Sequence, residues 1–266
     1  MPRAVLLLCF VAARCCLGAD APAPRDAPNY TAASIVNAAD NQSNTLAPNT
    51  IGTIYGTNLA HSTAGLTAGD IQGGVLPIML GASETTVYVG AFAADLYYVS
   101  PTQVNFLVPP MLLPGPVTVH IMVDTTSGPM IAMTLAPAAP GLFQLDASNA
   151  VATLVDGSVL TPASPAHPGD IVVLYATGLG ATVPPAVYGQ LPTAAAALAP
   201  GANLQILLDG VAVDPSAIMY AGIAPENAGL YQINLTLPMS VGANPQIQLV
   251  MGQASSISGV HLPVSR

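Results

Sequence analysis

The sequence contains one strand-and-turn pattern twice, and this internal repeat constrains the fold more than any other feature. The segment "YVSPTQVNFLVPP" (98–110) is followed later by "YAGIAPENAGLYQINLTLP" (220–238). Each has a tyrosine, a turn with proline, and a Gln-(Val/Ile)-Asn run that ends at proline. Apolar and polar residues alternate in both runs, which is typical of a strand with one buried face and one wet face. The repeat therefore predicts two related β-sheet units.

A second pair of segments shows where the backbone must turn. "LAPNTIGTIYGTNLA" aligns with "AHPGDIVVLYATGLG", and the two informative mismatches place Asn49 opposite Gly169 and Asn58 opposite Gly178. Asn and Gly share little except tolerance of a positive φ. The alignment therefore predicts that the same two left-handed turn positions flank the same strand in both copies.

The remaining segments complete a pattern of short strands. "TTVYVGAFA" aligns with "QILLDGVAV", which places Gly90 and Gly210 at equivalent hairpin turns. Other β-rich runs lie at 117–123, 130–137, 247–252 and 258–264. Short strands separated by Pro and Gly turns are typical of β-sandwiches. The predicted fold class is all-β, with two tandem immunoglobulin-like β-sandwich domains that arose from an internal duplication.

The N-terminus predicts export. Residues 1–18 carry Arg3, an apolar run and small residues suitable for cleavage, so they are predicted to be a signal peptide. The apolar run is too short for a membrane span, which needs about 20 residues. All three cysteines lie in this segment. We predict a flexible Pro/Ala-rich linker at 19–33, β-sandwich domain 1 at 34–145 and β-sandwich domain 2 at 146–266, in a bacterial protein that is secreted, periplasmic or at the cell surface.

Composition excludes two classes of partner. The chain has 266 residues, a formal charge of −9 and only four basic residues, all of them arginine. A nucleic-acid partner would require a basic surface to displace phosphate counterions, so this class is excluded. Proline and glycine interrupt every later apolar run, so no membrane span is predicted.

Five ordered motifs carry a family resemblance. "IYGTNLA", "YVSPTQVNFLVP", "APAAPGLF", "YATGLG" and "AGLYQINLTLP" together resemble the Solibacter C-terminal domain family, over the chain from about residue 35 onward. The resemblance implies an exported, β-rich bacterial domain of uncharacterised function, and it supplies no catalytic residues. The shorter "hydrophobic-Tyr-x-Thr-x-Leu" segments resemble IPT/TIG immunoglobulin-like domains.

No motif for catalysis or for cofactor binding is found. The sequence after residue 18 lacks cysteine, and it contains no G-x-S-x-G nucleophile turn and no H-E-x-x-H metal motif. The four histidines, which are His61, His120, His167 and His261, are interpreted as structural or surface residues. One alternative is a calcium site formed by Asp146, Asp156 and Asp170, because calcium prefers oxygen ligands. We expect no cofactor, no metal and no enzymatic activity.

Tyr97 is the candidate ligand contact. Neighbouring strand residues point to opposite faces, and only Tyr98 of the Tyr97-Tyr98 pair has a counterpart, Tyr220, in the second copy. Tyr97 is therefore predicted to be the free residue. The expected function is a non-catalytic interaction or adhesion module that binds an extracellular protein or a cell-envelope polysaccharide through the loops at 60–74 and 183–201. The alternatives are a carbohydrate-binding module and, less favoured, a hydrolase.

Overall fold

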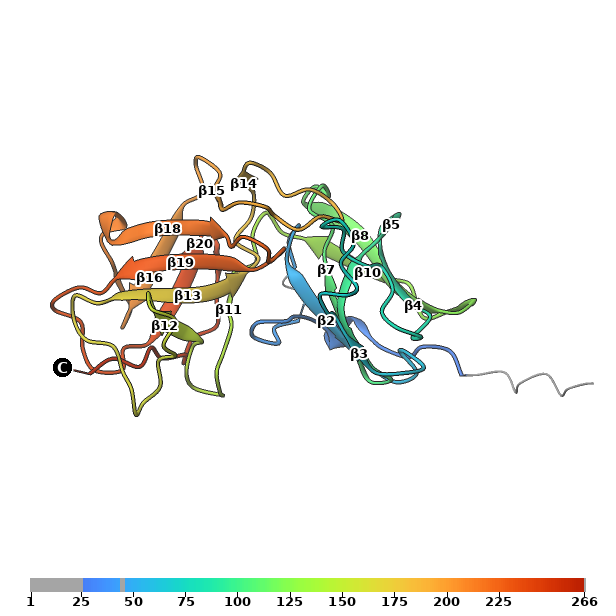
Figure 1. The fold of residues 1–266 in the computed structure, drawn as a ribbon, viewed down its shortest axis with the longest axis horizontal. Coiled ribbons are helices and arrows are strands. Elements are labelled where there is room, and N and C mark those ends of the chain that lie inside the picture. The colour runs from blue at the N-terminus through green and yellow to red at the C-terminus, as the bar shows by residue number, and fades with distance from the viewer. Residues whose placement is uncertain (1–25, 44–45, 266) are drawn as a thin grey trace, which may run out of the picture.

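The protein consists of two β-sandwich units that lie side by side along its long axis (Figure 1). The computed structural model describes residues 26–43 and 46–265, so the predicted signal peptide lies outside the described residues. Within them there is no α-helix, and the helical segments are two single 3₁₀ turns, η1 (Ala32–Ser34) and η2 (Pro215–Ala217). The all-β tandem fold predicted from the sequence is confirmed. No helix in this part of the chain is long and apolar enough to cross a membrane.

The first unit packs a five-stranded sheet against a second antiparallel sheet. The first sheet has the order β1-β2-β7-β6-β3, and the second has the order β10-β8-β4-β5, with β9 paired to β8. The strands are β1 (Ile35–Asn37), β2 (Ile51–Tyr55), β3 (Ala64–Gly65), β4 (Thr85–Val89), β5 (Phe92–Ala93), β6 (Asp95–Val99), β7 (Gln103–Leu107), β8 (Gly115–Val123), β9 (Thr126–Ser127) and β10 (Ile131–Leu135).

The second unit repeats this architecture. One sheet has the order β11-β13-β19-β18-β15-β14, with β12 paired to β13, and the other has the order β17-β16-β20-β21. The strands are β11 (Gly141–Leu142), β12 (Ala152–Leu154), β13 (Ile171–Thr177), β14 (Thr182–Val183), β15 (Ala196–Leu198), β16 (Leu204–Leu208), β17 (Val211–Ala212), β18 (Ile218–Ile223), β19 (Tyr231–Thr236), β20 (Ile247–Met251) and β21 (Ala254–Ser255). The run predicted at 258–264 forms only isolated bridges at His261 and Val264.

The two units agree in strand register as well as in strand order. In the first unit β2 lies between β1 and β7, and in the second unit the aligned strand β13 lies between β12 and β19. Aligned residues of β2 and β13 pair with corresponding residues of their neighbours. The matched pairs are Ile51–Leu107 with Ile171–Thr236, and Ile35–Ile54 with Ala152–Leu174. A slip of one residue would turn every core side chain toward water, so this agreement reflects the same alternation of apolar residues in both copies.

A β-bulge is also repeated. The pairing of β6 with β7 shifts register between Leu96 and Tyr98, and the pairing of β18 with β19 shifts between Ile218 and Tyr220. Tyr97 and Met219 are therefore the extra residues at equivalent bulges. A bulge re-aims the side chain of its extra residue, so simple alternation does not determine where Tyr97 and Met219 point.

The turn residues lie in the left-handed region in both units. The φ angles are 64° at Asn49 and 88° at Gly169, and 58° at Asn58 and 75° at Gly178. At the hairpins, Gly90 has a φ of 62° and Gly210 a φ of 78°. Because Asn is one of the few non-glycine residues that adopts this region at small cost, it can replace Gly between the copies.

Two predicted domain boundaries are corrected. Within the predicted linker at 19–33, Tyr30 is buried in the first core, and its hydroxyl donates to the Pro129 carbonyl and accepts from the Ile121 amide, both at 2.7 Å. The second unit begins before residue 146, because β11 pairs with β13 and Leu142 is buried in the second core. In both places a Pro- and Ala-rich segment belongs to a β-sandwich unit because one of its side chains, Tyr30 or Leu142, is buried in the core.

Candidate functional site

Buried side-chain hydrogen bonds join the two units. Thr177, at the end of β13, is fully buried, and its hydroxyl oxygen accepts from the backbone amide of Ile51 in the first unit at 3.0 Å. The same hydroxyl donates to the carbonyl of Gly229 at 2.7 Å. One threonine therefore satisfies a polar group on each side of the junction, and separating the units would leave the Ile51 amide without a partner.

Two asparagines of the first unit make further junction contacts. Asn37 donates from Nδ2 to the Ala139 carbonyl in the connecting segment at 3.0 Å. Asn49 donates from Nδ2 to the hydroxyl of Tyr231 at 3.2 Å, and that hydroxyl donates to the Gly180 carbonyl. Burial raises the pKa of Tyr231 to about 12, so this hydroxyl keeps its proton. These contacts fix the two units relative to each other.

The prediction that Tyr97 is free is corrected. Its ring packs against a small apolar cluster of Leu76, Leu107 and Ala228 at the junction, and its hydroxyl donates to the Ala228 carbonyl at 2.7 Å. Burial, followed by the nearby charge of Asp95, raises its pKa. The bulge at Tyr97 explains the difference, because it turns the side chain toward the second unit.

The two loops predicted as contact surfaces are partly used inside the molecule. The Leu191 amide donates to the carbonyl of Gly74, the last residue of the first loop, at 2.8 Å. Directly after that loop, Val75 forms a β-bridge with Gln190, and the Leu76 amide donates to the Gly189 carbonyl at 2.8 Å. This part of the two loops therefore stabilises the junction and is not available to a partner.

Asp95 is a buried acid at the same junction. It is 2% exposed, and its Oδ2 has no hydrogen-bond partner. Burial raises its pKa to about 6, and a hydrogen bond from the Gly189 amide opposes this shift. At neutral pH the junction therefore contains the Asp95 carboxylate, and the hydrogen bond from Gly189 offsets only part of the free-energy cost of burying its charge.

A pH dependence of stability follows from Asp95. The pKa in the folded state lies above the unfolded value of about 3.9, so its contribution is most favourable below pH 4 and is lost as pH rises through 6. For a shift of about 2 units, the expected loss between pH 4 and pH 7 is about 2–3 kcal/mol. Asp95→Asn should remove this loss, with higher stability than the parent at pH 7 and similar stability at pH 4. Urea unfolding at both pH values checks this, and a variant that is less stable at pH 7 would contradict it.

A groove follows the junction on the side of Asn49. It consists of two depressions of about 400 and 200 Å³ that share Asn49, Thr182, Pro185 and Ala186, and we call them together the junction groove. The other lining residues include Leu107, Leu112, Leu113, Pro110 and Val187. None of the described residues that line it carries a charge. Asn49 lines both depressions and is 5% exposed, and its Oδ1 is buried without a hydrogen-bond partner.

Four rings gather on the outer face of the first unit, beside the junction. Tyr88 and His120 stack at 5.0 Å with an interplanar angle of 11°, and Phe92 meets Tyr188 edge-on at 6.1 Å. Tyr188 comes from the second unit, and its hydroxyl donates to the Ala93 carbonyl beside Phe92. Its pKa is raised by burial and then by the charges of Asp95 and Tyr88. We call these four residues the ring cluster.

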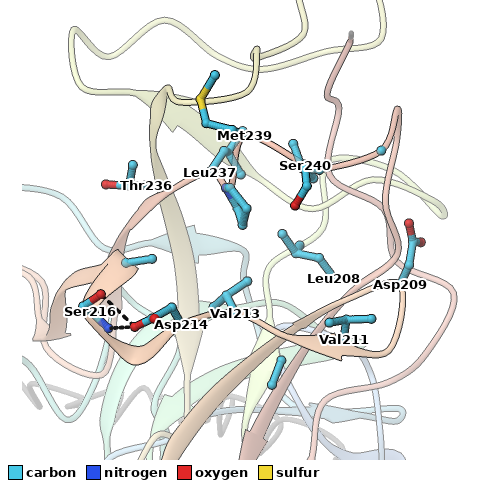
Figure 2. Close-up of a pocket in the computed structure, with 15 residues that line it drawn as sticks. Leu208, Asp209, Val211, Val213, Asp214, Ser216, Thr236, Leu237, Met239 and Ser240 are labelled. Atoms are coloured by element: carbon cyan, nitrogen blue, oxygen red, sulfur yellow. Dashed lines mark hydrogen bonds between the residues drawn. The ribbon is translucent and has the colours of Figure 1, made fainter.

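A third concavity lies in the second unit, and we call it the distal cavity. It has a volume of about 690 Å³ and lies between the β17–η2 segment and residues 236–242 (Figure 2). Its lining mixes apolar residues such as Leu237 and Met239 with Asp209 and Asp214. Hydrogen bonds from Ser216 lower the pKa of Asp214, so that group is ionised at neutral pH.

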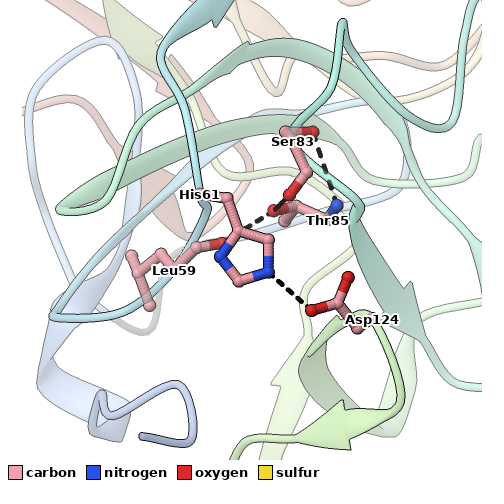
Figure 3. A network of polar contacts seen from close by, with 5 residues as sticks. All are labelled: Leu59, His61, Ser83, Thr85 and Asp124. Atoms are coloured by element: carbon pink, nitrogen blue, oxygen red, sulfur yellow. Dashed lines mark hydrogen bonds and ion pairs between the residues drawn. The ribbon is translucent and has the colours of Figure 1, made fainter. Parts of the chain in front are cut away.

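One mixed cluster of potential metal ligands is present among residues 26–43 and 46–265. His61, Glu84 and Asp124 are exposed and each offers a ligand atom within 4.8 Å of the others, and His61 Nε2 lies 2.6 Å from Asp124 Oδ2 (Figure 3). The predicted alternative of a calcium site is not supported, because Asp146, Asp156 and Asp170 do not come together. Each is used in its own turn, where it accepts from Ser148, Ser158 and His167 respectively.

The other histidines are separated from one another and from a nucleophile. His167 Nδ1 lies 3.6 Å from Asp170 in the same exposed turn. His120 belongs to the ring cluster, and burial lowers its pKa. His261 pairs through its backbone with Ser148 and Ala150. The hydrogen bonds of these three residues therefore do not join a histidine ring to a serine hydroxyl and an acid among the described residues.

The chain is similar to several solved structures at low sequence identity. No family model matches the sequence, and no curated relative matches it. Among solved structures, the chain is similar to the surface glycan-binding protein SGBP-B of the Bacteroides ovatus mixed-linkage glucan utilization locus, in complex with a mixed-linkage heptasaccharide, with 10% identity and a TM-score of 0.32 over 90% of this chain and 45% of that chain. It is also similar to the surface glycan-binding protein PbSGBP-B from Prevotella bryantii, with 13% identity and a TM-score of 0.26 over 88% of this chain and 41% of that chain. For the I9–I11 tandem of titin, the identity is 8% and the TM-score is 0.24, over 89% of this chain and 65% of that chain. The chain thus spans less than half of the two glycan-binding proteins. TM-scores this low carry no argument about this chain.

Sequence reasoning missed the residues that assemble the groove and the ring cluster. Asn49 was identified as a turn residue, and nothing local indicates that its side chain reaches across a junction. Phe92 and Tyr188 lie far apart in the sequence, and neither has an aromatic counterpart in the aligned copy. One signal for this contact was present in the alignment. The first copy has a polar side chain at Asn49, where the second copy has Gly169, and only Asn49 lies against another unit.

Proposed function

We propose that this protein is an exported, non-catalytic immunoglobulin-like module that binds an extended segment of an extracellular or cell-envelope protein in the junction groove. The observation that carries this proposal is an uncharged, mostly apolar groove whose two walls come from different units. Membership of the Solibacter C-terminal domain family is part of the same proposal.

The lining of the groove defines the chemistry of the partner. Leucine, proline and valine offer apolar contacts, and the absence of charge among the described lining residues disfavours a strongly charged ligand. Fixed walls reduce the ordering cost of binding, since preorganised sites lose less conformational entropy. Because the contacts are apolar, retention should depend only weakly on salt.

A carbohydrate partner is the second candidate, and the ring cluster favours it. Aromatic faces stack on apolar faces of sugars, and Phe92 is 39% exposed beside Tyr88 and Tyr188. The cluster lies outside the junction groove, so the two candidates use different residues and can be separated by mutation.

Three variants distinguish these candidates. Leu113→Glu places a charge at the rim of the groove, on a side chain that is 83% exposed, and Phe92→Ala removes a ring from the ring cluster. Met130→Glu, at another exposed apolar position (66%), is the matched control. Purified protein without residues 1–18 is incubated with peptides, polysaccharides and envelope fractions, and both retention and product release are measured.

For a protein partner, Leu113→Glu should weaken retention by about tenfold, or about 1.4 kcal/mol, while Phe92→Ala and Met130→Glu bind like the parent. For a carbohydrate partner, Phe92→Ala should show the loss instead. Retention that neither substitution changes would contradict both candidates, and product release would contradict the non-catalytic assignment.

A further inference from the structure

The chain leaves the second unit in the same way as it leaves the first. Ala136 donates from its amide to the Leu46 carbonyl at 2.9 Å, directly before the segment that connects the units. Ser265 donates from its amide to the carbonyl of Ala166 at 2.8 Å. Leu46 and Ala166 are aligned residues of the repeat, so the two exits lie at equivalent corners.

The sheet ends at these corners match bond for bond. In the first unit the Val108 amide donates to the Thr50 carbonyl at 2.9 Å and the Asn49 amide to the Val108 carbonyl at 3.0 Å. In the second unit, Leu237 takes the place of Val108 in the same two bonds, with Asp170 at 2.9 Å and Gly169 at 3.0 Å. The end of the first unit that carries the second unit therefore has a close structural counterpart on the second unit.

This counterpart is open and exposes apolar residues, although Asp209 and Asp214 also lie on it. It lies at the end of the molecule away from the first unit, near the C-terminus (Figure 1), and it contains the distal cavity. Tyr97, which the junction covers, corresponds to Met219, which is 61% exposed, and Met239 at the cavity rim is 80% exposed. Exposed apolar surface of this kind marks interaction sites, and methionine adapts to varied contacts.

The first unit presents a matching surface at its own far end. Thr177, which docks the second unit on the first, is aligned with Thr57, and Thr57 is exposed. The chain enters both units alike: Asn29 pairs antiparallel with Thr57, and Gly141 pairs antiparallel with the aligned Thr177. Both halves of the internal junction thus have exposed counterparts.

From this equivalence we propose that copies of this chain associate head to tail. The open end of the second unit, around Met219 and Met239, docks the end of the first unit of another copy, around Thr57. The two surfaces differ, so the contact is heterologous and extends into open chains.

The association is weaker than the internal junction for two reasons. Gly169 and Met219 stand where the internal junction has Asn49 and Tyr97, so those two side-chain hydrogen bonds have no counterpart. Separate copies also lack the effective concentration that a short connecting segment provides. The association therefore rises with protein concentration and leaves the structure of each copy unchanged.

Sedimentation velocity over a range of concentrations tests this, with the chain lacking residues 1–18 at about 0.15 M salt, where charge repulsion is largely screened. The parent should form dimers and larger species as concentration rises. Met239→Glu blocks one surface and Thr57→Glu blocks the other, so each variant alone should weaken self-association at least tenfold. Both positions are exposed, and unchanged thermal melting shows that each variant is folded.

The mixture of the two variants gives the decisive result. Each retains the surface that the other lacks, so an equal mixture should form a dimer that does not grow further, while Met130→Glu behaves like the parent. A parent that stays monomeric up to about 1 mM, where association contributes only about 4 kcal/mol, would overturn the proposal. Self-association that either substitution leaves unchanged, or a mixture that does not pair, would also overturn it.

Discussion

Replacing Gly178 by valine is expected to lower the free energy of unfolding by about 4 kcal/mol, which combines left-handed backbone strain with overpacking. Gly178 has a φ of 75°, which a β-branched residue rarely adopts. A Cβ at this position would lie 2.1 Å from the carbonyl oxygen of Ala139 in the connecting segment. Because that atom belongs to the backbone, either the connecting segment or β13 must move. Urea unfolding measured by circular dichroism checks the value.

Asn58→Gly is the matched control, because Asn58 is the aligned residue in the first unit. Its φ is 58°, which glycine adopts freely, so the change should be within a few tenths of a kcal/mol. If Gly178→Val had the same free energy of unfolding as the parent, then neither the left-handed backbone nor the close contact with Ala139 would require glycine at this turn.

Thr177→Val is expected to destabilise the protein by about 3 kcal/mol, although the two side chains have nearly the same shape. Valine would leave the Ile51 amide and the Gly229 carbonyl without a partner, at about 1–3 kcal/mol for each buried group. Thr57→Val, at the aligned and exposed position, should be nearly neutral. Unfolding of both variants in urea gives the comparison, and equal effects at the two positions would show that the junction bonds contribute nothing.

The sequence predicts the sandwiches well because their determinants are local. Alternation of apolar residues around Val104 and Ile233 specifies which face is buried, and the exchange of Asn49 for Gly169 marks a backbone conformation that few residues share. These features depend on residues within one strand or one turn. For this reason the strand order and register could be expected to repeat.

The junction could not be predicted because its determinants are not local. Asn37 and Thr177 are ordinary strand residues in the sequence, and their partners Ala139 and Ile51 lie in other parts of the chain. Tyr97 was assigned by alternation, which fails at a bulge. Tyr30 lies in a Pro- and Ala-rich segment, where a single buried ring determines that the segment is ordered.

The two units form one fixed body, and the junction groove exists only in that arrangement. The chain without residues 1–18 has no cysteine, so Met130→Cys together with Val155→Cys gives one spin-label pair, with one exposed site in each unit. Pulsed electron paramagnetic resonance then measures the distribution of distances between the labels. A single narrow distribution is expected in the parent, and a broader one is expected when Thr177→Val is added. A broad distribution in the parent, as for two domains on a flexible linker, would contradict the fixed arrangement of the units.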